Sequence, residues 1–152
     1  MDKATLKEKL LREKQFVDKT IKMLEDVIKH PDIDVHRVSA ASKYVYEIYM
    51  GIENILKISL KAKGIEVISS PEWHHDLIEL AKSKDLISQE TFEKLESLLG
   101  FRHFVAHGYS AILDKERVLE LGEMAMSTWN KFIPELERGF KYLIIMQKVC
   151  SI

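Results

Sequence analysis

The sequence predicts an all-α protein built as an up-down helical bundle, and two observations lead to this prediction. Apolar residues recur at spacings of three, four and seven along most of the chain, which is the period of one face of an α-helix. Only six glycines and three prolines interrupt this pattern. Because neither an internal repeat nor a low-complexity linker divides the chain, we expect a single domain over residues 1–152.

The first two segments are expected to be long helices. Over residues 5–29 apolar side chains recur between lysines and glutamates, and His30-Pro31-Asp32 would end this amphipathic helix. A second helix is expected over residues 35–62, ending at Gly64. Its apolar stripe is too wide for one partner helix, so this helix either occupies the centre of the bundle or lies at an oligomer interface.

Two shorter helices follow, each with a recognisable start. Ser70-Pro71-Glu72 offers an N-cap, a proline for the first helical position and an acid for the first turn, which predicts a helix to about residue 83. Ser88 is expected to cap a further helix over residues 89–106. Gly108 could supply the left-handed backbone that ends this helix.

The last helix is expected to be long. Asp114 is a suitable N-cap, and the helical pattern after it continues to about residue 147. Pro134 lies inside this segment and has no backbone N–H, so we expect it to kink or split the helix.

Charge and composition limit the classes of function. The apolar fraction of 46% allows a buried core, and 23 basic against 24 acidic residues give a net charge of −1, so a nucleic-acid site would have to be a local patch. Cys150, the single cysteine, excludes an intramolecular disulfide and a cysteine metal cluster and fits a reducing cytosol. With neither an N-terminal apolar signal segment nor a membrane-length apolar run, we expect a cytoplasmic protein without membrane contact.

One run of residues concentrates groups suited to phosphodiester chemistry. Arginine offers a permanent charge and a planar fork of donors that suits phosphate, and histidine can transfer protons near neutral pH. The competing interpretation is a helix end with two surface histidines, because short polar clusters arise by chance. The run reads Phe101-Arg102-His103-Phe104-Val105-Ala106-His107-Gly108-Tyr109.

The spacing within this run raises a geometric problem. Arg102 and His107 are about 140° apart on a continuous helix, whereas His103 and His107 share a face. Either the helix ends at His107 and Gly108 turns that histidine inward, or two copies of the helix end meet across a dimer axis and form one shared cleft. The wide apolar stripe of residues 35–62 would favour such a dimer.

In such a cleft the residues have distinct expected roles in RNA cleavage. His107 would take the proton from the ribose 2′-OH or protonate the leaving 5′-oxygen, and Arg102 would stabilise the extra negative charge on phosphorus. His103 could position phosphate or carry a second proton, and Tyr109 could contact phosphate or stack on a base. Since no carboxylate cluster for magnesium accompanies the run, we expect neither a metal nor a cofactor.

The remaining histidines have simpler interpretations. His103 and His107 could form half of a metal site, but no glutamate follows His103 as in zinc proteases, and two ligands are a weak signal. His74 and His75 stand beside Trp73, which fits a helix N-terminus with Trp73 in the core.

Glu53 lies in an otherwise apolar helix. We expect it to be solvated or paired with a base, and an ion pair with Arg102 or with a histidine would give it a role at the site. Tyr44, Tyr46 and Tyr49 of the same helix are expected in the core and at an interface.

The run resembles the signature of the HEPN superfamily. In that signature an arginine and a polar residue precede a histidine by a short spacer, and the toxin branch adds a tyrosine two residues later. The surroundings are similar to the HepT-like ribonuclease family, and the similarity spans about residues 37–125. The matching segments are Arg102-His103, His107, Tyr109, Gly51-Ile52-Glu53-Asn54, Trp73-His74-His75-Asp76-Leu77-Ile78 and Leu113-Asp114.

This resemblance implies more than the residues alone do. HEPN proteins are up-down bundles that dimerise and line a cleft with the motif of both protomers, and active members are metal-independent endoribonucleases. In toxin–antitoxin pairs, a minimal nucleotidyltransferase (MNT) encoded beside the HepT toxin binds it or adds AMP to the motif tyrosine. Carried over, Arg102 and His107 would be catalytic, His103 the polar motif residue and Tyr109 the modified residue. Beside these roles, we expect His103, Tyr109 and Glu53 to support the site or bind RNA.

Two departures from the family pattern bear on activity. The toxin branch commonly has asparagine where this chain has His103, and relatives often lose the second histidine, which this chain keeps as His107. We therefore expect a ribonuclease toxin of an MNT–HEPN pair. The alternatives are a non-catalytic HEPN module that presents substrate to a nucleotidyltransferase, and a helical interaction protein whose motif is incidental.

Overall fold

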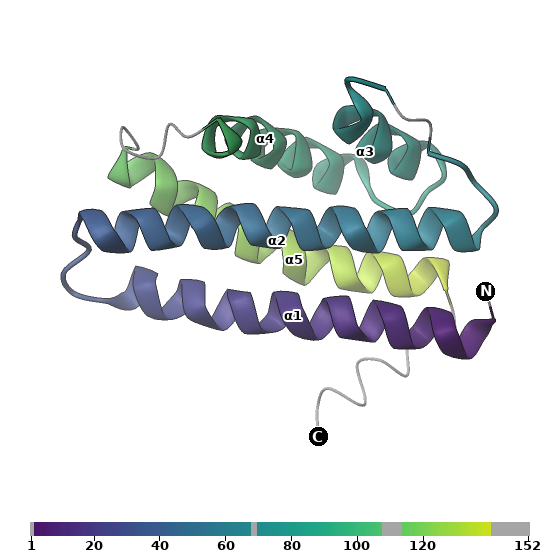
Figure 1. Cartoon of the computed structure of the whole chain (residues 1–152), viewed down its shortest axis with the longest axis horizontal. Helices are drawn as coiled ribbons and strands as arrows, with labels where there is room; N and C mark the ends of the chain where they lie inside the picture. The colour runs from purple at the N-terminus through teal and green to yellow at the C-terminus, as the bar shows by residue number, and fades with distance from the viewer. Residues whose placement is uncertain (1, 68–69, 108–113, 141–152) are drawn as a thin grey trace.

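The described part of the chain consists of helices and the turns between them. The computed structural model describes residues 2–67, 70–107 and 114–140, and its helices pack along one another in a bundle (Figure 1). The predicted all-α bundle is therefore confirmed. The helices are α1 (Lys3–Lys29), α2 (Val35–Ala62), α3 (Trp73–Ser83), α4 (Gln89–Ala106) and α5 (Lys115–Gly139).

Helix α2 lies at the centre of the bundle (Figure 1). It packs against α1, α3, α4 and α5, and it runs antiparallel to α1 as α4 does to α5. Its apolar stripe is thus shared among four helices of the same chain, so the central position is the expectation that the structure confirms. For the same reason, the width of the stripe gives no argument for an oligomer interface. Its fully buried apolar side chains include Ile48, Ile52, Ile55, Leu56 and Leu60.

Side-chain caps and one glycine set several helix ends as predicted. Ser88 and Asp114 accept hydrogen bonds from the backbone N–H groups of Thr91 and Glu116, at 3.2 and 3.3 Å, so both are N-caps. Gly64 follows α2 with a φ of 76°, a left-handed conformation that residues with a Cβ rarely adopt.

The start of α3 differs from the prediction. The helix begins at Trp73, and Ser70 does not cap it. The Ser70 hydroxyl donates to Asp76 Oδ2 at 2.9 Å, and the Ser70 carbonyl accepts from the Trp73 N–H at 3.1 Å, which closes a turn before the helix. Serine followed by proline favours turns as well as helix starts, so the same residues fit both structures.

Helix α5 ends earlier than predicted. It ends at Gly139, and Phe140 leaves the helical backbone with φ −138° and ψ 94°. The rest of the predicted segment, to about residue 147, lies outside the described residues. Glycine weakens a helix because it has the most backbone freedom to lose. Pro134 lies inside α5 without splitting it, so the expected split is wrong.

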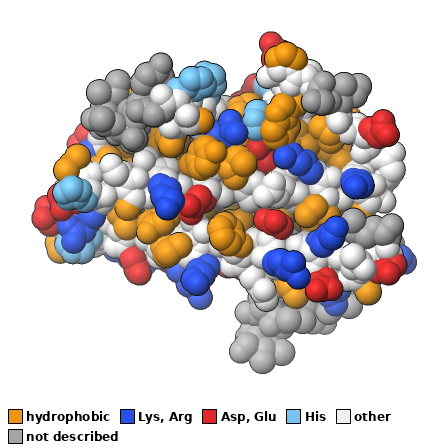
Figure 2. All heavy atoms as spheres, in the orientation of Figure 1, with side chains coloured by type: hydrophobic (Ala, Val, Ile, Leu, Met, Phe, Trp, Pro, Cys, Tyr) orange, Lys and Arg blue, Asp and Glu red, His pale blue; other side chains and the backbone are white. Residues whose placement is uncertain are grey.

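The face formed by α1 and α2 carries charges of both signs. Figure 2 shows acidic and basic side chains interspersed over this face, with hydrophobic side chains gathered along the border between α2 and the layer of α3 and α4. Any RNA contact on this side would therefore depend on a local patch. Within the residues described, no helix has an apolar stretch that is long enough to cross a membrane.

Gly51 allows α1 and α2 to approach closely. It is buried, and a Cβ at this position would overlap Val17 Cγ2 of α1. We expect Gly51→Ala to lower the free energy of unfolding by about 1–3 kcal/mol, because the buried, β-branched Val17 has little freedom to move away. Urea unfolding would measure this loss.

Gly100 of α4 provides the matched control for Gly51. A Cβ added to Gly100 meets no atom within 4 Å, so Gly100→Ala should keep or raise the stability through its better helix propensity. An equal loss in both variants would contradict a close approach at Gly51.

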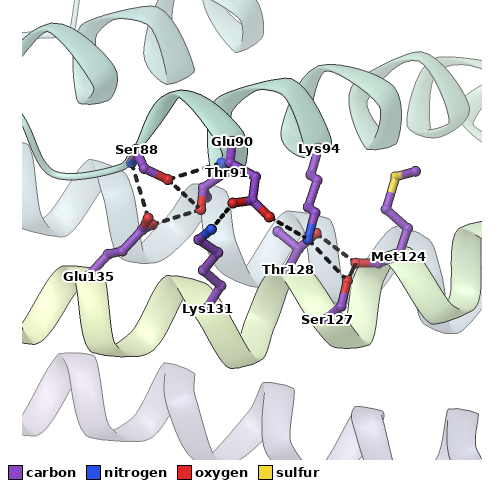
Figure 3. Close-up of polar contacts among 9 residues, drawn as sticks. All are labelled: Ser88, Glu90, Thr91, Lys94, Met124, Ser127, Thr128, Lys131 and Glu135. Atoms are coloured by element: carbon purple, nitrogen blue, oxygen red, sulfur yellow. Dashed lines mark hydrogen bonds and ion pairs between the residues drawn. The ribbon is translucent and has the colours of Figure 1, made fainter.

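Polar contacts hold the start of α4 on α5 (Figure 3). The Glu135 carboxylate accepts hydrogen bonds from the Thr91 hydroxyl at 2.7 Å and from the Ser88 backbone N–H at 3.3 Å. Glu135 and Thr91 are both buried, so these bonds satisfy groups that water does not reach. Lys131 pairs with Glu90 across the same two helices. These contacts fix α4 in the bundle, and with it the helix end that carries the arginine–histidine run.

Candidate active site

The arginine–histidine run occupies the last turn of α4. Arg102 is half-buried, whereas His103 and His107 are exposed. His107 is the C-cap, and its backbone N–H donates to the His103 carbonyl at 3.2 Å. The helix thus ends where the sequence predicts, while Gly108 and Tyr109 lie outside the described residues.

Arg102 is held against the central helix. Its Nε donates to Met50 Sδ at 3.2 Å, and its guanidinium carbon lies 5.6 Å from the centre of the Tyr46 ring. A thioether is a weak acceptor and an aromatic face a modest partner for a cation. Within the described residues Arg102 forms no ion pair with a carboxylate, so its charge is available to an anionic ligand.

His107 is held in one tautomer by its own helix. Its Nδ1 lies 2.8 Å from the His103 carbonyl oxygen. A carbonyl oxygen can only accept, so Nδ1 carries the proton and, in the neutral ring, Nε2 has the lone pair. This assignment makes Nε2 the atom that can take a proton from a substrate hydroxyl.

The structure brings the two histidines together and directs the arginine elsewhere. The rings of His103 and His107 have their centres 4.1 Å apart. The hydrogen bond of Arg102 goes to α2, whereas that of His107 goes back to α4. Gly108, which the first of the two geometric solutions requires to turn His107 inward, lies outside the described residues.

Glu53 pairs with a histidine of α3. It is fully buried in α2, and its Oε2 lies 2.6 Å from His74 Nδ1. Of the expected arrangements, solvation is wrong and pairing with a base is the one observed. The other oxygen, Oε1, has no hydrogen-bond partner among the described residues.

The imidazole of His74 is also stacked. Its ring centre lies 3.6 Å from that of Trp73, and Lys57 Nζ lies 4.1 Å from the centre of the Trp73 ring. Trp73 is half-buried and packs against the hydrophobic core. This agrees with the simpler interpretation of Trp73 as a core residue at a helix N-terminus.

A buried tyrosine lies between these groups. Burial raises the pKa of the Tyr49 hydroxyl, the nearby Glu53 carboxylate raises this pKa further, and Arg102 opposes the rise. The Tyr49 hydroxyl has no hydrogen-bond partner among the described residues. Glu53 of α2 and Arg102 of α4 thus each influence the Tyr49 hydroxyl.

A separate group of side chains on α3 could ligate a metal ion. Atoms of His75, Asp76 and Glu79 lie within 4.8 Å of one another, and His75 Nε2 lies 3.3 Å from Glu96 Oε2. Asp76 and Glu79 are exposed, and exposed acids often gather without a metal. This group is on α3 and not on the helix end that carries the motif.

A cavity of about 380 Å³ between α4 and the start of α5 is not the candidate site. Its lining includes Phe101, Phe104 and Leu121. Among the described residues, Arg102, His103 and His107 do not line it. It therefore lies on another face of α4.

Sequence reasoning missed three contacts at the site. It did not assign Met50 and Tyr46 to Arg102, nor His74 to Glu53. The available signal was that positions 46, 50 and 53 fall on one face of a helix, which would place them together before a neighbour.

Comparison with known proteins supports the family resemblance. A family model described as "HepT-like protein" matches residues 40–143, which include most of α2 and all of α3, α4 and α5. No curated protein and no solved structure matches the chain.

Proposed function

Because the chain belongs to the HepT-like protein family, we propose that it is a metal-independent endoribonuclease and the toxin of a HEPN/MNT toxin–antitoxin pair. The observation that carries the proposal is the exposure of His107 and the tautomer that its hydrogen bond fixes. His107 is an exposed histidine whose Nδ1 donates to a carbonyl, so that Nε2 is the proton acceptor. It lies on the same helix end as Arg102, which has no carboxylate partner among the described residues.

In the proposed reaction, the ribose 2′-oxygen attacks the adjacent phosphorus and the bond to the 5′-oxygen breaks. His107 Nε2 takes the 2′-OH proton, or the imidazolium form returns a proton to the leaving 5′-oxygen. Arg102 binds the phosphate oxygens as their negative charge grows. The products are a 2′,3′-cyclic phosphate and a 5′-hydroxyl. His103, exposed beside His107, would hold phosphate or carry the second proton.

We propose that the working cleft is formed by two chains. Within one chain the hydrogen bonds of Arg102 and His107 go to different helices, which supports a site that combines the arginine of one protomer with the histidine of its partner. A homodimer is thus part of the proposed function.

RNA cleavage by purified protein in EDTA tests the proposal. We expect cleavage that leaves 2′,3′-cyclic phosphate ends and persists without divalent metal. If folded, dimeric protein does not cleave any RNA, the alternative function is favoured, in which the chain is a non-catalytic HEPN partner of a nucleotidyltransferase.

A second proposal concerns control by an MNT-type nucleotidyltransferase. We expect this partner to bind the chain and to add AMP to Tyr109, which stands two residues after His107. The added phosphate would bring negative charge to the cleft and block RNA, so AMP addition should abolish cleavage. Intact-mass measurement and a cleavage assay after incubation with the partner and ATP would check this.

Tyr109→Phe provides the control for AMP addition. The mass and the cleavage activity of this variant should be the same before and after incubation with the partner and ATP. Full activity of wild-type protein that carries AMP on Tyr109 would contradict the blocking role.

A further inference from the structure

Glu53 is a buried carboxylate that two different helices could satisfy. It is fully buried in α2, and a carboxylate in such a place is costly unless donors or a counter-charge compensate for the lost water. His74 approaches it from α3, and Arg102 of α4 contacts Met50, three residues before Glu53 on α2. Lys57, one turn further along α2, is directed to the Trp73 ring.

In the structure, the Glu53 carboxylate is hydrogen-bonded to His74. Nδ1 of His74 lies 2.6 Å from Glu53 Oε2, and only 19% of the His74 side chain is exposed. Stacking on Trp73 fixes the plane of the imidazole. The first turn of α3 thus supplies a preoriented donor for Glu53.

Arg102 bonds a weaker acceptor on the same stretch of α2. It donates to Met50 Sδ, and Met50 is three residues before Glu53, so the two side chains are neighbours on the α2 surface. Both Glu53 and Arg102 act on the hydroxyl of Tyr49. A guanidinium prefers a carboxylate to a thioether, because the carboxylate is charged and can accept in the bidentate geometry of the guanidinium, whereas a thioether sulfur is a weak acceptor.

On the basis of the proposed function, we infer that His74 is a positioning residue: it occupies the Glu53 carboxylate and so leaves the Arg102 guanidinium unpaired for the RNA phosphate. Without His74, the buried charge of Glu53 would draw Arg102 into an ion pair and away from the substrate. A contact between α2 and α3 would thereby decide whether Arg102 of α4 is available to bind the RNA phosphate.

NMR of the Arg102 Nε–Hε group tests this directly, whether or not the protein cleaves RNA. In wild type we expect the signal of a weakly bonded Hε, and in His74→Ala a downfield shift that reports a bond to carboxylate. Adding Glu53→Gln to His74→Ala removes the charge and should return the signal toward its wild-type position. The same signal in all three proteins would overturn the inference.

His75→Ala is the matched control. His75 is the next residue of α3 and contacts Glu96 and Glu79 instead of Glu53, so its loss should leave the Arg102 signal unchanged. Circular dichroism would establish that each variant is folded. If His74→Ala is unfolded, His74→Phe, which keeps a ring against Trp73 but has no donor for Glu53, takes its place with the same expected direction of shift.

Cleavage kinetics give the second readout. We expect His74→Ala to lower kcat/KM for RNA about tenfold or more, because Arg102 is misplaced, and Glu53→Gln/His74→Ala to recover most of that loss. A structural role of His74 alone would predict no recovery in the double variant. If wild type cleaves no RNA, the proposed function fails, while the NMR comparison still decides the role of His74.

Discussion

Replacement of His107 by alanine is expected to lower kcat for RNA cleavage by about 10²- to 10⁴-fold, the usual contribution of a general acid or base. His107 is exposed at the end of α4, so the change removes a proton carrier and little buried packing. Single-turnover cleavage in EDTA would measure the loss. Circular dichroism should give the same helicity for both proteins.

His103→Ala is the control for this prediction. His103 is an exposed histidine on the same turn, with its ring centre 4.1 Å from that of His107. Its expected role is to position the phosphate or to carry a second proton. A smaller loss is therefore expected. Full activity in His107→Ala would rule out the proposed proton transfer, and equal losses would assign it to both rings.

Arg102→Ala is expected to lower kcat by about 10²- to 10³-fold, as the loss of a preorganised group that stabilises transition-state charge does elsewhere. The guanidinium is half-buried against Met50 and Tyr46, so a modest loss of stability should accompany the loss of rate. Arg102→Lys keeps the charge without the planar fork and should retain partial activity. A fully active Arg102→Ala protein would contradict the phosphate-binding role.

Mixing the two inactive variants separates a shared cleft from a site within one chain. If Arg102 of one protomer works with His107 of its partner, a mixed dimer has one site with both native residues and one with neither. Equal mixing should then restore up to about a quarter of the wild-type activity. No recovery in dimers that exchange subunits would place each complete site in a single chain.

The helical class and most helix ends follow from the sequence because their causes are local. The apolar period, the caps Ser88 and Asp114 and the left-handed Gly64 act within one or two turns. The predictions fail at Ser70, whose hydroxyl bonds Asp76 instead of capping α3, and at the end of α5. In both places the local signal fits two structures.

For the site, the sequence by itself singled out the candidate residues and predicted that Arg102 and His107 diverge on one helix. Only the tertiary structure decided that Glu53 pairs with His74, 21 positions away, and that Arg102 bonds Met50, 52 positions away. Such pairs depend on how α2, α3 and α4 pack, and a carboxylate in the core takes whichever donor the packing brings nearest. No spacing along one helix encodes that choice.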